Sequence, residues 1–464
     1  MPEERPAGRL LVLGVLRASD GSWQPGQVWI EGERIAAVLT GRPAAPPPAS
    51  VVVHDMGESF LLPGAVDGHV HSYSHEGEGL AAATASAAAG GVTTIVEMPF
   101  DALSAPSGGA VNSRDRLLRK LDAVAEEARV DVALLGTLAP GGGWRRAEEL
   151  VATGAVGFKV SLFLTDPVRF PRIDDRELLN VMAAVGETGS TLCTHAENNE
   201  VISGLLAEQH PKRSTDPFEH SRTRPPVAET LGVLTALEVA ADKGNALHVC
   251  HLSLPRSIDL VHWYAHQGVD VTLEVCPHYL TFTEGDLTSQ RGRLKINPPL
   301  RTADDRDGLW DRLAAGGVNV ISSDHAPWPT SMKDDPVMLN NHSGVPGVET
   351  LVPVTLGGAL ARGLDVFGRA VDALTLGPAR RYGLDAVKGS LEPGKDADLM
   401  VFTPGDAPID GATQHSNAGW SPYDGFRPGG QVVLTLSRGR VVYTLDDGVT
   451  GRPGDGRAVT RSAR

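Results

Sequence analysis

The sequence predicts an α/β fold in which eight parallel strands, with a helix after each, close into a (β/α)8 barrel. Short apolar or β-branched runs alternate with segments rich in Ala, Leu, Glu and Arg between residues 61 and 389. This alternation is typical of βα units around a parallel sheet, and eight such runs suit a barrel with enlarged loops. The alternative is a doubly wound open sheet. It is disfavoured because no Gly-rich phosphate-binding loop follows the first run.

The predicted barrel strands follow one another at intervals long enough for an intervening helix. In chain order they are Phe60–Val66, Val92–Met98, Val132–Thr137, Gly157–Leu162, Thr191–His195, Ala246–His251, Val271–Val275 and Val318–Ser322. We expect residues 61–389 to form the catalytic barrel.

Both ends of the chain carry β patterns without intervening helices. The runs are Leu10–Leu16, Gly26–Ile30, Leu399–Phe402 and Val432–Val442, the last interrupted by a turn at Ser437–Arg440. We therefore expect residues 1–60 and 390–445 to join in one small β-sandwich domain. Residues 446–464 are rich in Gly, Arg, Pro and Ser, which predicts a mobile tail.

The composition narrows the classes of function. Of 464 residues, 41% are hydrophobic and 21% are charged, as in an ordinary folded protein, and the net charge is −15. An acidic chain without a Lys/Arg block argues against nucleic acid or an anionic membrane as the partner. The apolar run at Leu10–Leu16 is interpreted as a strand, not a signal peptide, because it stops at Arg17 and has no small-residue cleavage site. No run is apolar and long enough to span a bilayer.

Cysteine is scarce. Cys193, Cys250 and Cys276 all fall on or beside predicted barrel strands, where small core residues are more common than nucleophiles. Three cysteines exclude a disulfide framework and favour a reducing compartment, so we expect a cytoplasmic protein.

Residues of metal-binding type follow several predicted strands. His69 and His71 come directly after the first strand. Side chains two apart on an extended chain point the same way, so the pair can chelate one metal ion, although the pair alone also fits two surface histidines. His195 ends the fifth strand, His251 the sixth, and Asp324 follows the eighth. Because barrel enzymes build their active sites at the carboxyl ends of strands, the sequence predicts a metal site there.

Lys159 lies on the fourth strand between Phe158 and Val160. A buried lysine cation is costly, and two interpretations stay open. The side chain extends to the surface, or the neutral amine adds carbon dioxide and the resulting carbamate bridges two cations.

Seven motifs together are highly specific. They are Pro63–His71, Gly157–Lys159, His195–Asn198, Cys276–Leu280, Asn297–Arg301, Ser323–Pro327 and Gly389–Asp398. On these motifs the chain resembles, over nearly its whole length, the cyclic amidohydrolases of the dihydroorotase, allantoinase and hydantoinase group.

The resemblance implies a site with two divalent metal ions, expected to be zinc, with Mn, Co or Ni as alternatives. Position by position, His69 and His71 would bind the first ion, His195 and His251 the second, and N6-carboxylated Lys159 would bridge them. Such a pair activates water for attack on a ring carbonyl.

Asp324 completes the implied set, as a ligand of the first ion and as the catalytic residue. It would take the proton of the attacking water and deliver it to the leaving ring nitrogen. All six metal-binding positions are filled, which disfavours a non-catalytic scaffold relative.

Two further residues, Asn297 and His278, are candidate contacts to the substrate. Asn297 would hold the amide edge of the ring, or cap the loop before Pro298. His278 would contact substrate or cap its own loop. We interpret His248 as a packed residue behind the metal ligands and His325 as structural.

Two positions argue against dihydroorotate as the substrate. Dihydroorotases grip the substrate carboxylate with an Arg two residues after the His-x-His pair and a His four residues after the aspartate. The present chain has Tyr73 and Trp328 there, so a carboxylate would lack its clamp unless Arg301 supplies one.

Hydantoinases and dihydropyrimidinases usually carry a Tyr five residues after the bridging lysine, where this chain has Leu164. The segments 323–333 and 421–423 look most like those of allantoinases. The expected reaction is therefore hydrolysis of allantoin to allantoate, a step of purine catabolism.

A hydantoinase, dihydropyrimidinase or other cyclic imide hydrolase ranks second and dihydroorotase third. A mononuclear deaminase of the same superfamily is the alternative of a different class. The expected partners are a small cyclic amide and further copies of the chain, in a dimer or tetramer.

Overall fold

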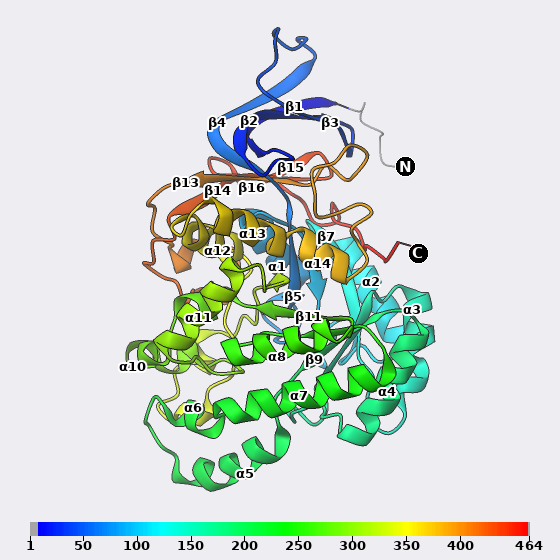
Figure 1. Ribbon diagram of the computed structural model, residues 1–464, viewed down its shortest axis with the longest axis vertical. Coiled ribbons are helices and arrows are strands. Elements are labelled where there is room, and N and C mark those ends of the chain that lie inside the picture. The colour runs from blue at the N-terminus through cyan, green and yellow to red at the C-terminus, as the bar shows by residue number, and fades with distance from the viewer. Residues whose placement is uncertain (1–7, 463–464) are drawn as a thin grey trace.

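The computed structural model describes residues 8–462 and contains two eight-stranded sheets (Figure 1). One is the barrel, whose strands pair in parallel in chain order. They are β5 (Ala65–Val70), β6 (Val92–Glu97), β7 (Asp131–Gly136), β8 (Gly157–Ser161), β9 (Thr191–His195), β10 (Leu247–Val249), β11 (Val271–Val275) and β12 (Val320–Ile321). A bridge between Val70 of β5 and His325, which follows β12, closes the barrel. The predicted barrel is confirmed.

Helices surround the barrel between its strands (Figure 1). They are α1 (Gly79–Ala89), α2 (Arg114–Glu127), α3 (Ala147–Thr153), α4 (Asp175–Glu187), α5 (Asn199–Gln209), α6 (Glu219–Thr223), α7 (Pro226–Lys243), α8 (Pro255–His266), α9 (Pro277–Thr281), α10 (Leu287–Gln290), α11 (Ala303–Ala314), α12 (Leu351–Leu360), α13 (Leu364–Leu374) and α14 (Leu376–Arg381).

Helix α4 illustrates how the sequence sets these elements. The Asp174 carboxylate accepts a hydrogen bond from Glu177 N at 2.8 Å and caps the first turn. Its buried residues recur at helical spacing, at Leu178, Val181, Met182 and Val185, so one stripe packs on the barrel and the rest faces outward.

The first barrel strand begins later than the sequence predicted. Phe60 to Pro63 belong to β4 (Val51–Pro63) of the other sheet, and β5 starts only at Ala65. Gly64 separates the two, and a Cβ there would lie 2.2 Å from Thr93 Oγ1, so only glycine permits this approach. Because β5 runs on to Val70, His69 lies within the strand itself. The strands β10 and β12 are likewise shorter than expected, since the chain turns out of the barrel directly after them.

The second sheet draws strands from both ends of the chain, as predicted. Its order is β16-β15-β14-β13-β4-β1-β2-β3, with β1 (Arg9–Arg17), β2 (Trp23–Glu31), β3 (Arg34–Thr40), β13 (Leu399–Pro404), β14 (Gly430–Ser437), β15 (Arg440–Thr444) and β16 (Gly448–Val449). Leu10, Ile30, Leu61, Val401 and Leu434 belong to one buried cluster within it, so the two chain ends share a core.

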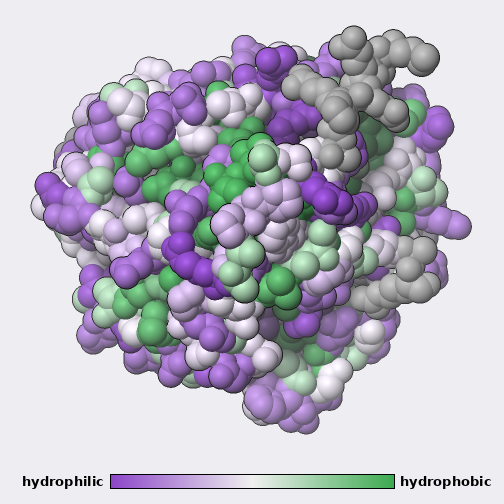
Figure 2. Space-filling model, turned by 90° about the horizontal axis from the view of Figure 1, so that it is seen from above, coloured by the Kyte–Doolittle hydropathy of each residue, from purple (hydrophilic) through white to green (hydrophobic). Residues whose placement is uncertain are grey.

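The surface at this end of the molecule carries hydrophobic residues in several small patches among hydrophilic ones (Figure 2). Leu39, Val52 and Val53 are exposed apolar residues of the β domain. Within residues 8–462, no helix combines the length and apolar character that crossing a bilayer requires.

Residues 451–462 contact the barrel, which their polar composition did not indicate. Val132 N donates to Arg457 O, and Val459 N donates to Val132 O, both at 2.9 Å. The Arg457 guanidinium also pairs with Glu33 of the β domain.

A buried ion cluster joins the barrel to the β domain. Lys388 is 1% exposed at its side chain, and its Nζ lies 2.6 Å from Asp131 Oδ2, 2.7 Å from Asp398 Oδ2 and 3.0 Å from Asp396 Oδ2. Burial would lower the pKa of Lys388, but the three carboxylates outweigh it and raise the pKa. The Arg438 Nε adds a contact to Asp131 at 3.1 Å, so each buried charge has a partner.

Replacing Lys388 by Met should destabilise the fold by about 3–5 kcal/mol, because it leaves buried carboxylates without their cation. Chemical denaturation measures the free energy of unfolding. The matched control is Lys212→Met, since Lys212 is exposed, and it should stay within about 0.5 kcal/mol of wild type. Equal stability of Lys388→Met and wild type would contradict the proposed importance of the cluster.

Candidate metal centre

The six predicted donors come together at the carboxyl ends of the barrel strands. His69 lies in β5, Lys159 in β8 and His195 at the end of β9, whereas His71, His251 and Asp324 follow β5, β10 and β12 directly. All six line one cavity of about 440 Å³.

Three of the donors form one group. The Nε2 atoms of His69 and His71 are 3.2 Å apart. Asp324 Oδ1 lies 3.2 Å from the first of these nitrogens and 3.6 Å from the second. Three ligand-type atoms within 4.8 Å of one another can share a single cation.

Two further donors form a second group. His195 Nδ1 and His251 Nε2 lie 3.0 Å apart. The pKa of His251 is held well below its ordinary value, first by burial and then by the charge of Lys159, so its ring is neutral and able to donate a lone pair.

Lys159 lies against both groups. Its side chain is buried, and among residues 8–462 its Nζ has no hydrogen-bond partner. Burial alone would lower the pKa of Lys159, but its interactions with the Cys250 side chain and the Glu274 carboxylate outweigh burial and leave the pKa raised. The surface interpretation of Lys159 is wrong, because β8 lies inside the barrel wall and the side chain points into the cavity.

This donor set suits two divalent cations. Imidazole and carboxylate ligands match zinc and related metals. The nitrogen lone pairs face one another across gaps that a cation would fill, and the orphaned Lys159 Nζ would gain partners on carboxylation.

Two of the donor residues have a left-handed backbone. The φ angles are 39° at His251 and 47° at Asp324, a conformation that costs free energy for residues other than glycine. Each is braced by a buried carboxylate. Glu274 Oε1 accepts from His251 N at 3.0 Å, and Asp67 Oδ1 accepts from Ser323 N at 3.0 Å. Strain of this kind at a cavity is typical of functional sites.

Carboxylates also hold the histidine rings. Glu274 Oε1 lies 2.5 Å from His69 Nδ1, and Glu197 Oε2 lies 2.7 Å from His195 Nε2. The sequence analysis assigned no role to either acid. Glu274 had a signal, since it is a carboxylate in the otherwise apolar second half of Val271–Val275.

Asp324 is ionised at neutral pH. Burial would raise the pKa of Asp324, but the charge of His69 and the hydrogen bond to His71 outweigh it and lower the pKa far below its usual range. Burial lowers the pKa of His71 to about 4, so this ring is neutral.

The two predicted substrate contacts are placed differently. Asn297 lines the cavity, and its buried Oδ1 has no hydrogen-bond partner in the described part of the chain. His278 is buried on α9 outside the lining. His248 bonds to Glu274 behind the ligands, and His325 Nδ1 accepts from Gly347 N at 3.0 Å, as expected of structural residues.

The cations around the cavity are largely engaged. Arg224 pairs with Glu197, and Arg169 Nε lies 3.2 Å from Asp166 Oδ2. Lys295 Nζ donates to Leu339 O at 2.8 Å, and burial lowers its pKa to about 7. Arg301 points away, with Nε donating to Ser253 Oγ at 2.9 Å, so the predicted alternative clamp does not reach the cavity.

A wall of the cavity is aromatic and apolar. Phe100 and Phe170 stack with ring centroids 3.4 Å apart, and Trp328 and Leu164 line the same space. Tyr73 lies outside the lining, where its hydroxyl donates to Glu127 at 2.9 Å.

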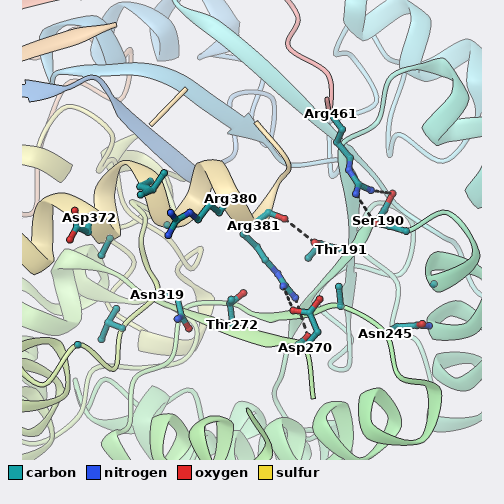
Figure 3. A pocket seen from close by; sticks show the side chains of 18 of the residues that line it. Ser190, Thr191, Asn245, Asp270, Thr272, Asn319, Asp372, Arg380, Arg381 and Arg461 are labelled. Atoms are coloured by element: carbon teal, nitrogen blue, oxygen red, sulfur yellow. Dashed lines mark hydrogen bonds and ion pairs between the residues drawn. The ribbon is translucent and has the colours of Figure 1, made fainter. Parts of the chain in front are cut away.

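A larger cavity of about 720 Å³ lies at the opposite, amino-terminal end of the strands (Figure 3). Two of its arginines bind carbonyl or carboxylate oxygens there. Arg461 donates to Gly189 O at 2.6 Å and Arg381 to Leu247 O at 2.5 Å, while Arg381 also pairs with Asp270 at 2.7 Å. No cluster of three or more metal-ligand side chains was found here within residues 8–462.

Fold and donor set together define a barrel hydrolase of metal-dependent type. The profile of the amidohydrolase family matches residues 60–442, and the chain belongs to this family. It is a hydrolase, and the predicted resemblance to cyclic amidohydrolases is confirmed.

Several relatives are similar over most of the chain. An allantoinase of Rubrobacter xylanophilus is 36% identical over 85% of this chain and 86% of its own length. An allantoinase of Enterococcus faecalis is 33% identical, covering 84% and 87%. Among solved structures, the L-hydantoinase (dihydropyrimidinase) of Arthrobacter aurescens superposes with a TM-score of 0.91 at 30% identity, covering 97% of this chain and 99% of that one.

We predict that Lys159→Ala loses bound metal and hydrolytic activity, because the change removes the one donor that faces both groups. Metal analysis after dialysis and an activity assay measure the two losses, and a short carboxylic acid supplied with metal should restore part of both. Lys212→Ala is the control at an exposed lysine. Full metal content and activity in Lys159→Ala would exclude the two-metal arrangement.

Proposed function

We propose that this chain hydrolyses allantoin to allantoate. The observation that carries the proposal is the convergence of six metal-type donors in one cavity of a chain with allantoinase relatives that are 30–36% identical. Apart from Lys159, the cationic side chains that line this cavity already have protein partners, which supports a neutral ring as substrate.

The proposed cofactor is a pair of divalent ions, zinc first, with Mn, Co or Ni as alternatives. The residues proposed to hold it are His69, His71 and Asp324 for one ion, His195 and His251 for the other, and N6-carboxylated Lys159 between them. When bound, such ions lower the pKa of water and polarise a carbonyl, which makes amide hydrolysis feasible near neutral pH.

Asp324 is the proposed catalytic residue. Its carboxylate lines the cavity and is ionised, so it can accept the proton of the attacking water as the new oxygen–carbon bond forms. It then donates that proton to the ring nitrogen as the carbon–nitrogen bond breaks, and the nitrogen leaves as a neutral group. This transfer is needed because an unprotonated amide nitrogen is a poor leaving group.

Asn297 is the proposed contact to the amide edge of the ring. Its Oδ1 has no hydrogen-bond partner among the described residues and can accept a hydrogen bond from a ring N–H. His278 is the second proposed contact: it lies outside the cavity lining, but its buried Nε2 has no hydrogen-bond partner within residues 8–462.

A second candidate is hydrolysis of 5-substituted hydantoins. The stacked rings of Phe100 and Phe170 offer an apolar wall, and the superposition on an L-hydantoinase fits this reaction. Dihydroorotate ranks lower because Arg301 is turned away. A mononuclear deaminase would leave the buried Lys159 without a role.

The biological setting is proposed on the same basis. Purine catabolism is the pathway class of allantoin hydrolysis. We further propose a cytoplasmic homo-oligomer, a dimer or tetramer, that acts on a small molecule without nucleic acid or membrane as partner.

Asp324→Asn should lower kcat by a factor on the order of 10² or more, because an amide can neither accept nor deliver the proton. The measurement compares kcat at equal metal occupancy. Asp334→Asn is the control at a half-exposed aspartate outside the cavity. If turnover per bound metal is unchanged in Asp324→Asn, the residue has no role in proton transfer.

Allantoin or a neutral hydantoin should exceed dihydroorotate in kcat/KM by more than tenfold, or more than about 1.4 kcal/mol. The reason is that a buried carboxylate without a cationic partner costs several kcal/mol. A panel of allantoin, dihydroorotate, dihydrouracil and 5-aryl hydantoins decides the order. Preference for a 5-aryl hydantoin would favour the second candidate, and comparable turnover of dihydroorotate would overturn the exclusion of carboxylate substrates.

A further inference from the structure

We propose that Glu274 is a positioning residue that holds the two halves of the metal centre in register, an inference that rests on the proposed metal centre. The residue lies on β11 and touches neither the cavity nor the proposed substrate. It acts through two of the proposed ligands, one from each half.

A single oxygen atom of Glu274 reaches both halves. Oε1 lies 2.5 Å from the ring nitrogen Nδ1 of His69 and 3.0 Å from the backbone nitrogen of His251. His69 lies in β5 and His251 follows β10. These two strands are not neighbours in the barrel sheet. The carboxylate therefore joins two strands across the barrel interior.

The contact to His69 fixes which ring nitrogen is free. With Nδ1–H donating to Glu274, the lone pair lies on Nε2, the atom that faces His71 and Asp324. A carboxylate behind a histidine ligand both orients the ring and increases its basicity.

The contact to His251 holds a strained backbone. His251 has a φ of 39°, and its N–H would be left without this partner if Glu274 were replaced by an apolar residue. This conformation directs the ring so that Nε2 lies 3.0 Å from His195 Nδ1. Relaxation of the backbone would move that nitrogen away from its partner group.

Glu274 is itself held in place from the other side. Oε2 accepts from His248 Nε2 at 3.2 Å, and His248 Nδ1 lies 2.8 Å from Thr272 Oγ1. Thr272 lines the cavity at the opposite end of the barrel (Figure 3). A chain of hydrogen bonds thus runs through the barrel from that cavity to the proposed ligands.

The charge of Glu274 is unexplained by the fold alone. Its carboxylate is 0% exposed, and its ion-pair partners in the described chain are histidines, with no lysine or arginine within 4.0 Å. Burying a carboxylate without a permanent cation costs several kcal/mol. A cation held by His69, His71 and Asp324 would supply the missing positive charge.

The test compares Glu274→Gln with Asp131→Asn, which also changes a buried carboxylate to an amide but lies in the Lys388 cluster. Metal release to a chelator, metal content after dialysis and the visible absorption spectrum of the cobalt-loaded protein are measured for each. We expect Glu274→Gln to release metal 10–100-fold faster or bind it 10–100-fold more weakly, and to change the cobalt spectrum. Asp131→Asn should lower the unfolding temperature without altering metal release, metal content or the cobalt spectrum.

Unchanged metal release and an unchanged cobalt spectrum in folded Glu274→Gln would overturn the proposal. If that variant does not fold, Glu274→Asp keeps the charge and shortens the side chain, so one oxygen can no longer reach both His69 and His251. Glu274→Asp should show the same loss of metal retention, and wild-type retention in it would equally overturn the proposal. None of these readouts uses a substrate, so they stand or fall separately from the assignment of allantoin.

Discussion

The site depends on the seam where the first barrel strand meets the last. The segment that follows the short strand β12 meets β5 through the bridge between His325 and Val70. The Asp67 carboxylate braces this seam, since it accepts hydrogen bonds from His69 N at 3.2 Å and from Ser323 N at 3.0 Å. The first donor group takes His69 and His71 from one side of the seam and Asp324 from the other. Closure of the barrel therefore also brings these three donors together.

Much of this could be predicted from sequence. The alternation of apolar runs and helical segments defined the barrel, and the strand-end rule placed His195 and Asp324 in one cavity. The start of β5 was missed because an unbroken apolar run crosses Pro63 and Gly64, and only the crowding against Thr93 shows that the chain changes sheets there. The periodicity of apolar residues and the secondary-structure propensities carry no information about such contacts between distant segments.

The carboxylates behind the histidines were missed for a related reason. Glu197 stands two residues after a proposed ligand, yet nothing local shows that its oxygen turns back to the His195 ring. Glu274 is 205 residues from His69. Both acids are recognised as partners of the histidines only because they are buried beside them, and burial is visible only in the folded chain. The contrast with Lys388, whose three carboxylates form a self-contained ion cluster, separates charges that hold the fold from charges directed toward a site.

The composition of the β sheet from both chain ends has a consequence for biosynthesis. The strand β4 pairs with β13, so that Leu61 lies opposite Val401 and Phe60 opposite Phe402. On the ribosome the N-terminal strands emerge more than 300 residues before their partners. Until translation reaches β13, the apolar edge of β4 is open to pairing with other chains. The barrel strands are therefore synthesised while the edge of β4 is still unpaired. This order of synthesis exposes the nascent chain to aggregation.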